Sequence, residues 1–328
     1  MNFKEIKKID AHIHYNINRD ALINEAESNN FALVSINTSV PDFPDITEQE
    51  SIILKLQHSH PQRIYHVGTF PISNWDTDDW VDFTIDYIKR DLEHGALGIK
   101  IWKNVGMSLR DKNGQLVMID HPKLDPVFKY LEDNEITFLG HQGEPKNCWL
   151  PVKEMTVNQD IDYYSNHPQY HMYKHPELPS YEDQINARDN VLKKHKNMKF
   201  VGAHLASLEW DTNEIAKRLE EFPNMAVDMA ERVCHLEYQC LTDWKKVYDF
   251  FVKYQDRILY GTDIIYDESF TDDEIRKTIK KRWLDDWKFF TTNEMMSVPR
   301  VNGTFKGLGL PEEIIHKIYY NNASKWYF

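Results

Sequence analysis

Two histidines near the N-terminus are spaced so that they could hold one metal ion. They end an apolar stretch, Lys7–His14, that has the composition of a β-strand. Because side chains alternate between the two faces of a strand, His12 and His14 should point the same way. Neutral imidazole is the commonest protein ligand for zinc and related ions. The pair therefore predicts part of a metal site.

A His-x-His pair alone is weak evidence for a metal. The chain has 15 histidines in 328 residues, for which chance predicts roughly 0.7 such pairs. A second pair, His58 and His60, lies at the end of a helical pattern just before Pro61, where a solvated helix end is the simpler interpretation. Residues further along the chain must decide between the two pairs.

Eight apolar stretches of strand length alternate with helical patterns along the chain. The expected strands cover about residues 7–14, 31–37, 63–70, 96–102, 135–142, 199–205, 225–229 and 257–263. Such a series closes into a parallel barrel when each connection is right-handed. The sequence therefore predicts an α/β protein with a (β/α)8 TIM-type barrel, in a single domain that spans residues 1–328.

The alternation breaks once, between Gly143 and Pro179. This stretch is too long for an ordinary connection, and loops of that length are commonly functional or disordered. Its aromatic residues favour an ordered insertion over the mouth of the barrel, forming an apolar lid or a subunit contact. Those residues are Trp149, Tyr163, Tyr164, Tyr170 and Tyr173.

Three histidines inside this stretch recur every four residues, which is the spacing of a metal site on a helix. They are His167, His171 and His175, and prolines at 168 and 176 interrupt them. Because proline breaks a helix interior, the three cannot share one regular helix. We do not expect a metal there.

The ends of the expected strands bring most of the candidate chemistry together. In TIM-type barrels the active site lies at the C-terminal ends of the strands. These positions hold His12 and His14 on strand one, Lys100 on strand four, His141 on strand five, His204 on strand six and Asp263 on strand eight. A lone histidine at a strand end is more often a hydrogen-bonded core residue. So many aligned by chance would be unusual, and the set predicts one site.

This set, in this order, resembles the amidohydrolase superfamily, and its details resemble the amidohydrolase-related branch. The motifs are Asp10-Ala-His-Ile-His14, Gly140-His141, Gly202-Ala-His204, Tyr260-Gly-Thr-Asp263 and a closing-helix motif, Ile318-Tyr-Tyr-Asn-Asn-Ala-Ser324. The resemblance covers nearly the whole chain. It implies that His12, His14, His141 and Asp263 bind a divalent metal, most often zinc. It also implies that His204 binds a second metal or hydrogen-bonds the reacting group.

Lys100 decides how many metal ions the resemblance implies. In binuclear members a lysine on the fourth strand is carbamylated and bridges two ions, and the segment Gly98–Trp102 resembles that setting. Similar Gly-x-Lys sequences also occur in the branch without a bridging role, so we favour one ion over two. Without carbamylation, the ammonium of Lys100 could pair with a substrate carboxylate or with Asp263.

The implied chemistry is metal-dependent hydrolysis. A bound divalent ion makes water reactive at neutral pH and polarises a carbonyl. The expected enzyme cleaves a C–N, ester or lactone bond of a small, carboxylated molecule. Asp263 would pass the proton of the attacking water to the leaving group, and His204 would stabilise the oxyanion.

Two other functions stay open. The same site could serve a lyase, either a nonoxidative decarboxylase or a hydratase, in which Asp263 or His204 protonates the carbon that loses CO2. A catalytically idle barrel that only binds partners is the third possibility. The intact set of expected ligands argues against an idle barrel.

Residues just after the strands would lie at the level of a bound substrate. The candidates are Trp102 after strand four, Glu144 after strand five, and Glu231 and Arg232 after strand seven. Arg232 could bind a carboxylate through two parallel hydrogen bonds. An ordinary surface ion pair is the alternative for this arginine.

Composition limits the partners. The net charge of −13 disfavours nucleic acid and anionic membranes, which need a basic face. We see no signal peptide and no membrane-spanning stretch. The three cysteines, Cys148, Cys234 and Cys240, lack metal-finger spacing and indicate reduced thiols. We expect a cytoplasmic enzyme for a small-molecule substrate, and a homo-oligomer stays open.

Overall fold

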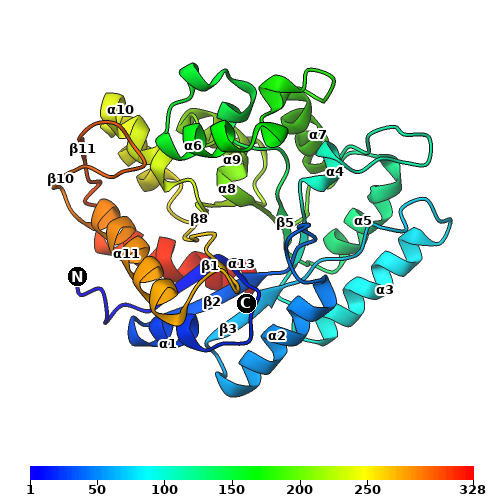
Figure 1. Ribbon diagram of the computed structural model, residues 1–328, viewed down its shortest axis with the longest axis horizontal. Helices are drawn as coiled ribbons and strands as arrows, with labels where there is room; N and C mark the ends of the chain where they lie inside the picture. The colour runs from blue at the N-terminus through cyan, green and yellow to red at the C-terminus, as the bar shows by residue number, and fades with distance from the viewer.

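Eight parallel strands surrounded by helices make up the protein in the computed structural model, which describes residues 1–328 (Figure 1). The strands are β1 (Lys8–Tyr15), β2 (Phe31–Ile36), β3 (Ile64–Val67), β4 (Ile99–Ile101), β5 (Phe138–Gly140), β6 (Phe200–Gly202), β7 (Met225–Asp228) and β8 (Ile258–Leu259). Neighbours in the chain pair in parallel within each sheet. All eight expected strands are present, and the predicted TIM-type fold is confirmed.

One long helix follows each barrel strand and covers its outer face. These helices are α1 (Ala21–Ser28), α2 (Ile46–Ser59), α3 (Trp80–Glu93), α5 (Asp125–Asp133), α7 (Tyr181–Lys194), α9 (Thr212–Glu221), α10 (Val233–Lys253) and α11 (Asp272–Thr291). The helical pattern in the sequence begins only near Thr242, so α10 starts earlier than that pattern predicts. The backbone kinks at Asp243, whose side chain accepts a hydrogen bond from the Lys246 backbone N–H as a helix cap does. The sequence signal therefore marked the kink rather than the start.

The strands form two sheets that backbone hydrogen bonds connect into a ring. One sheet has the order β3-β2-β1-β9, where β9 is Ile265–Tyr266, and the other runs from β4 to β8 in order. Residues 66–68 bond to residues 97–100 at one seam, and residues 11–12 bond to residues 260–263 at the other. The ends of the first and last barrel strands are therefore neighbours.

A bulge in β1 turns both of its terminal histidines toward the barrel interior. The pairing of β1 with β2 shifts between Asp10 and Ile13, where β1 holds one more residue than its partner. Ala11 belongs to the interior cluster, whereas Asp10 accepts a hydrogen bond from α11. Simple alternation would place His12 on the outer side with Asp10. Because of the bulge, His12 and His14 instead face inward, as bulges near active sites often arrange.

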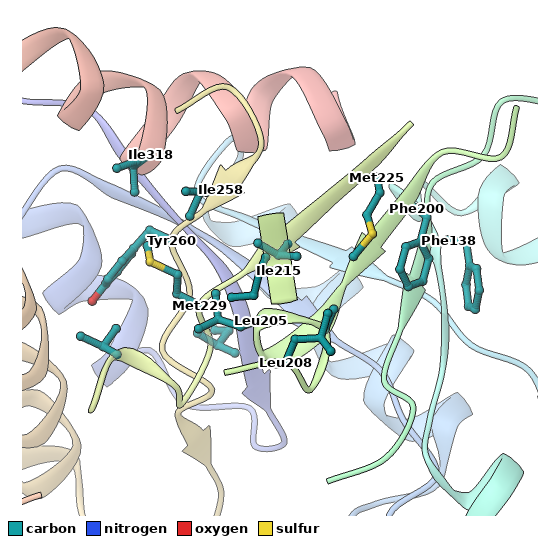
Figure 2. Close-up of a cluster of buried hydrophobic side chains, with 14 of the residues drawn as sticks. Phe138, Phe200, Leu205, Leu208, Ile215, Met225, Met229, Ile258, Tyr260 and Ile318 are labelled. Atoms are coloured by element: carbon teal, nitrogen blue, oxygen red, sulfur yellow. The ribbon is translucent and has the colours of Figure 1, made fainter. Parts of the chain in front are cut away.

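The last helix of the chain closes the N-terminal end of the barrel. It is α13 (Asn322–Tyr327), and its Ala323, Trp326 and Tyr327 pack with inward-facing strand residues. Those strand residues are Ile9, Ala11, Val34, Ile36, Val67, Leu139, Val201, Ala203, Ala226 and Leu259. A larger hydrophobic cluster fills the space between the strands and the outer helices (Figure 2). Apolar side chains therefore fill the N-terminal end of the barrel, and the polar residues lie at its C-terminal end.

The stretch from Gly143 to Pro179 is ordered, as its aromatic content predicts. It contains α6 (Asn158–Asn166) and several short 3-10 helices. A small core of Cys148, Met155, Tyr164 and Met172 holds it together. We call residues 143–179 the insertion. Its remaining aromatic residues divide into the half-buried Trp149 and the exposed Tyr163, Tyr170 and Tyr173.

The segment after α11 contains a short hairpin that the sequence did not predict. Strands β10 (Met295–Met296) and β11 (Phe305–Lys306) pair antiparallel. The chain then continues through α12 (Glu312–His316) and a π-helical turn into α13. None of the helices combines the length and apolar character that crossing a bilayer requires.

A buried group of charges connects α10 to α11 and the hairpin. Glu237 is fully buried, and its Oε2 lies 3.9 Å from Nη2 of Arg300. The same Nη2 lies 3.3 Å from Oδ1 of Asp286. Burial raises the pKa of Glu237 to about 7, against the ordinary value of 4.5, and the charge of Arg300 offsets only part of this. Glu237 is therefore protonated in the folded protein below about pH 7.

This raised pKa predicts a loss of stability as the pH rises. Between pH 4.5 and about 7 the unfolded chain has released the Glu237 proton while the folded protein keeps it. The Glu237→Gln variant stays neutral and lacks this effect. The unfolding free energy of the variant minus that of wild type should therefore increase by about 3 kcal/mol as the pH rises from about 4 to about 8. Urea denaturation of both proteins at both pH values checks this, and a pH-independent difference would contradict it.

Candidate metal centre

Three side chains from opposite ends of the chain converge at the mouth of the barrel. Oδ1 of Asp263 lies 3.4 Å from Nε2 of His12 and 3.3 Å from Nε2 of His14. One donor atom from each of these residues lies within 4.8 Å of the other two. Two imidazoles and a carboxylate so close together form a donor set suited to a divalent cation. The structure thus brings together three of the ligands expected from the sequence.

The other two histidines lie beside this group. The ring of His204 is 4.9 Å from that of His12 and 4.2 Å from that of His141, measured between centroids. Neither ring nitrogen of His141 has a hydrogen-bond partner, although the residue is 93% buried, its exposed fraction being 7%. Oδ1 of Asp263 also lacks a hydrogen bond. Buried polar atoms without hydrogen-bond partners are rare in proteins, and here their positions fit a role as metal ligands.

Hydrogen bonds to the far side of the imidazoles fix which nitrogen faces the site. Nδ1 of His12 contacts Oδ2 of Asp228 at 2.8 Å, and Nδ1 of His14 donates to the carbonyl of Ile36 at 2.7 Å. Each bond places the ring proton on Nδ1 and leaves Nε2 as a free electron-pair donor. This is how outer partners orient metal-binding histidines.

The protonation states also suit a metal. Burial lowers the pKa of His14, of His141 and of His204, the last to about 3, so these rings are neutral at pH 7. Burial would raise the pKa of Asp263, but His204, His14 and His12 outweigh it and hold this pKa well below its usual value. The site therefore presents neutral imidazoles and an ionised carboxylate, the forms that bind cations.

Lys100 reaches the same site from β4. Its side chain is buried, and Nζ lies 3.2 Å from Nε2 of His12. Burial lowers the pKa of Lys100 to about 8, with Asp263 and Asp228 opposing the shift. A cavity of about 10 Å³, enough for one water, adjoins Lys100 and is lined in part by Trp102 and Thr69.

Asp228 is the residue that the sequence reasoning missed. It ends β7 and is fully buried, and its Oδ1 accepts the backbone N–H groups of His204 at 2.8 Å and Ala230 at 3.1 Å. Through Oδ2 it also holds His12. One carboxylate therefore orients side chains from the first and sixth strands. An acidic residue at the end of an otherwise apolar strand was the available signal.

An Asp228→Asn substitution should weaken metal binding. If the amide keeps its oxygen on the backbone N–H groups, its NH2 group faces His12 and forces the ring proton onto Nε2. That tautomer cannot donate an electron pair to the site. We expect a 10- to 100-fold loss of zinc affinity, in line with other outer-partner substitutions. Competition with a chromophoric chelator measures it.

Asp91→Asn is the matched control for this substitution. Asp91 is also a buried carboxylate facing a buried histidine, with 3.4 Å between its Oδ1 and Nε2 of His66, but it lies away from the site. The control should keep wild-type zinc affinity. Equal losses in the two variants would show that the effect of Asp228 is a general loss of stability.

The backbone at this mouth is strained at three strand ends. His204, Glu231 and Asp263 have φ values of 58°, 57° and 62°, in the left-handed region that non-glycine residues rarely adopt. Such conformations persist only where surrounding contacts hold them, and they concentrate at functional sites.

The residues expected near a substrate have different environments. Glu144 is buried and pairs with Lys103, while Trp102 stays half-buried beside the small cavity. Glu231 accepts hydrogen bonds from Gln159 of the insertion and, at 2.8 Å, from Arg282 of α11. Both Glu231 oxygens are therefore engaged in holding elements together.

Arg232 is not in the surface ion pair that was its alternative. Its exposed fraction is 8%, Nη1 donates to the carbonyl of Glu231 at 3.2 Å, and Nε has no partner. Burial lowers the pKa of Arg232, but Asp160, Glu209, Tyr164 and Glu144 together outweigh it and raise this pKa. The guanidinium is thus charged, buried and only partly hydrogen-bonded.

The two rival histidine clusters lie outside the site. His60 contacts Asp20 at 3.5 Å and Glu27 at 3.8 Å, as a solvated helix end would. In the insertion His167, His171 and His175 bond to separate backbone carbonyls, those of Tyr163, Leu150 and Pro168. Neither cluster gathers its nitrogens around one point.

Comparison with known proteins gives a family and a fold. The amidohydrolase family model matches residues 63–328. No curated protein sequence matches the chain. Solved structures that resemble it include an uncharacterized TIM-barrel protein from Bordetella bronchiseptica, with 13% identity, a TM-score of 0.55 and 98% of each chain covered.

Two further structures have a TM-score of 0.53 and cover 98% of this chain. One is an amidohydrolase II with 16% identity, of whose chain 99% is covered. The other is a 2,6-dihydroxybenzoate decarboxylase from Rhizobium with 13% identity and 98% coverage. At these identities the likeness concerns the fold.

Proposed function

We propose that the mouth of the barrel is the active site of a metal-dependent hydrolase, because this chain belongs to the amidohydrolase family. The family typically binds a divalent metal, and its members are enzymes. The observation that carries the proposal is the convergence of His12, His14 and Asp263 donor atoms within 4.8 Å.

His12, His14, His141 and Asp263 would hold the ion. Imidazole nitrogens with a carboxylate oxygen are a set that zinc favours, so Zn²⁺ is the proposed metal. The two unpartnered nitrogens of His141 and the free Oδ1 of Asp263 support their inclusion. Nδ1 of His204 donates to the carbonyl of Ala230 at 2.9 Å, which leaves Nε2 for a second ion or for substrate.

A divalent cation supplies the site with Lewis acidity, which makes water reactive near neutral pH and polarises a carbonyl group. Asp263, ionised at pH 7, would accept a proton from the attacking water and pass it to the leaving group. His204 would stabilise the developing oxyanion by a hydrogen bond from Nε2 once this nitrogen has taken up a proton, because its Nδ1 proton is donated to the carbonyl of Ala230. Turnover therefore depends on both residues.

Lys100 has two proposed roles that depend on the number of ions. As an ammonium 3.2 Å from His12, it would repel a second cation and pair with a carboxylate of the substrate. As a carbamate it would bridge two ions. Of these two roles we favour the ammonium, with one metal. Arg232, buried with an unpartnered Nε, is a second candidate for a substrate carboxylate.

A lyase that uses the same site is the second candidate function. Two buried cations near the mouth, Lys100 and Arg232, would suit a carboxylated substrate in either reaction. A solved protein of this fold is a decarboxylase. In this version Asp263 or His204 would first take up a proton from solvent and then deliver it to the carbon that loses CO2.

Isotope labelling separates the two reactions. Small carboxylated amides, esters, lactones and aromatic acids would be screened with the zinc-loaded protein. Hydrolysis in ¹⁸O-labelled water places one labelled oxygen in the product and releases no CO2. Decarboxylation in D2O releases CO2 and leaves deuterium on carbon. Hydrolysis is the expected result, and CO2 release without ¹⁸O incorporation would overturn it in favour of the lyase.

A further inference from the structure

The residues after β6 form a left-handed turn, and this turn carries His204. Four consecutive residues, His204 to Ser207, have φ values between 54° and 58°, and none of them is glycine. Left-handed backbone brings Cβ too close to the following carbonyl, so such residues occur singly rather than in runs. A run of four needs contacts from outside to hold it.

Helix α7 supplies two of these contacts. Arg188 donates from Nη1 to the carbonyl of Ala206, and the hydroxyl of Tyr181 donates to the carbonyl of Ser207 at 2.5 Å. Both side chains are buried. The helix therefore binds the turn two and three residues beyond His204.

Both donors are themselves fixed. Nε and Nη2 of Arg188 donate to Oδ1 of Asp189 at 3.0 and 2.6 Å, and Asp189 also accepts a bond of 3.2 Å from Arg218. The Tyr181 oxygen accepts the indole N–H of Trp210 at 2.8 Å. These bonds hold both donor side chains in place against the turn.

The inner side of the turn packs tightly against the barrel. Leu205 and Leu208 are buried in the hydrophobic cluster that includes Met229 (Figure 2). A Cβ on Gly202 would lie 2.5 Å from Cβ of Ala206, so the turn closes directly onto β6. His204 is the first residue of this left-handed run, so its backbone is continuous with the turn that α7 holds. A change in the turn therefore moves its imidazole.

We propose that Arg188 and Tyr181 are positioning residues that orient His204 by holding the left-handed turn. Neither touches the proposed metal ligands, and both act through the backbone of residues 206 and 207. The inference rests on the proposed place of His204 in the site. Its test observes the imidazole itself, so its failure is distinct from a failure of the hydrolase proposal.

The test uses the ring Cε1–H NMR signal of His204 in protein with ¹³C-labelled histidine, assigned by its loss in His204→Gln. Tyr181→Phe and Arg188→Met should shift or broaden this signal at constant pH. The signal of His60, at the end of α2, should stay in place. Because Tyr181→Phe removes a single oxygen, it decides the matter if Arg188→Met does not fold.

Two control variants make the same chemical changes elsewhere. Tyr254→Phe removes a hydroxyl that donates to Glu220 at 2.7 Å, outside the barrel. Arg257→Met removes a guanidinium that also donates to backbone carbonyls, including that of Met225 at 2.9 Å, at the start of β7. The controls should leave the His204 signal unchanged. A wild-type signal in folded Tyr181→Phe, or an equal change in the controls, would overturn the proposal.

Discussion

An Asp263→Asn variant should fold normally and lose turnover by at least 10²- to 10⁴-fold, the range that a general acid or base contributes. The fold should survive because no protein hydrogen bond to Oδ1 is lost. Turnover should fall for two reasons. The amide cannot take up the proton, and it is a weaker ligand than a carboxylate for a divalent cation. Steady-state rates on any substrate of the wild-type protein measure the loss.

Metal content distinguishes the two causes in this variant. If the variant keeps its zinc but not its activity, Asp263 acts mainly in proton transfer. If it loses both, Asp263 acts at least as a ligand. Asp267→Asn is a suitable control, because its carboxylate only accepts local bonds from Ser269 after β9. A turnover rate for Asp263→Asn equal to that of wild type would refute its assignment.

Removal of a first-strand histidine should have the second large effect. Nε2 of His12 lies 3.4 Å from Asp263, and the ring is fixed by Asp228 on its other side. His12→Gln removes the ligand nitrogen but keeps a polar side chain of similar length. We expect a loss of zinc affinity larger than the 10- to 100-fold loss for an outer partner such as Asp228. Elemental analysis after dialysis against chelator measures it.

His195→Gln is the matched control. His195 is another buried histidine with a carboxylate partner, Glu132 at 3.3 Å, but it lies at the C-terminal end of α7. Its substitution should cost stability and leave the zinc content at one equivalent. Zinc retained by His12→Gln would place the ion elsewhere or show that the pair on β1 is not part of its site.

Much of the fold and the candidate site was predictable because the signals are local. Each barrel strand is a short apolar run, and a polar residue at its end, such as His141 or Asp263, stands out against that background. The plan of a parallel barrel then places all such ends on one side. That these residues gather at one end of the barrel therefore follows from their positions in the chain and the fold class alone.

Other parts depend on contacts that no local pattern encodes. The bulge in β1 arises from its pairing with β2, and it decides which side of the strand His12 occupies. Asp228 contacts His12 although 216 residues separate them. The left-handed turn after β6 contains no glycine that would indicate it in the sequence. Contacts with α7 and packing against the barrel offset the free-energy cost of its backbone conformation. Sequence reasoning could not reach these features without the tertiary structure.

The most direct measurement of the central claim is a crystal structure with anomalous data at the zinc absorption edge. We expect one strong peak bound by Nε2 of His12, Nε2 of His14 and a carboxylate oxygen of Asp263, with His141 completing the set. A second peak beside a modified Lys100 would change the number of ions but not the site. Zinc-loaded crystals with no peak among these residues would contradict the account.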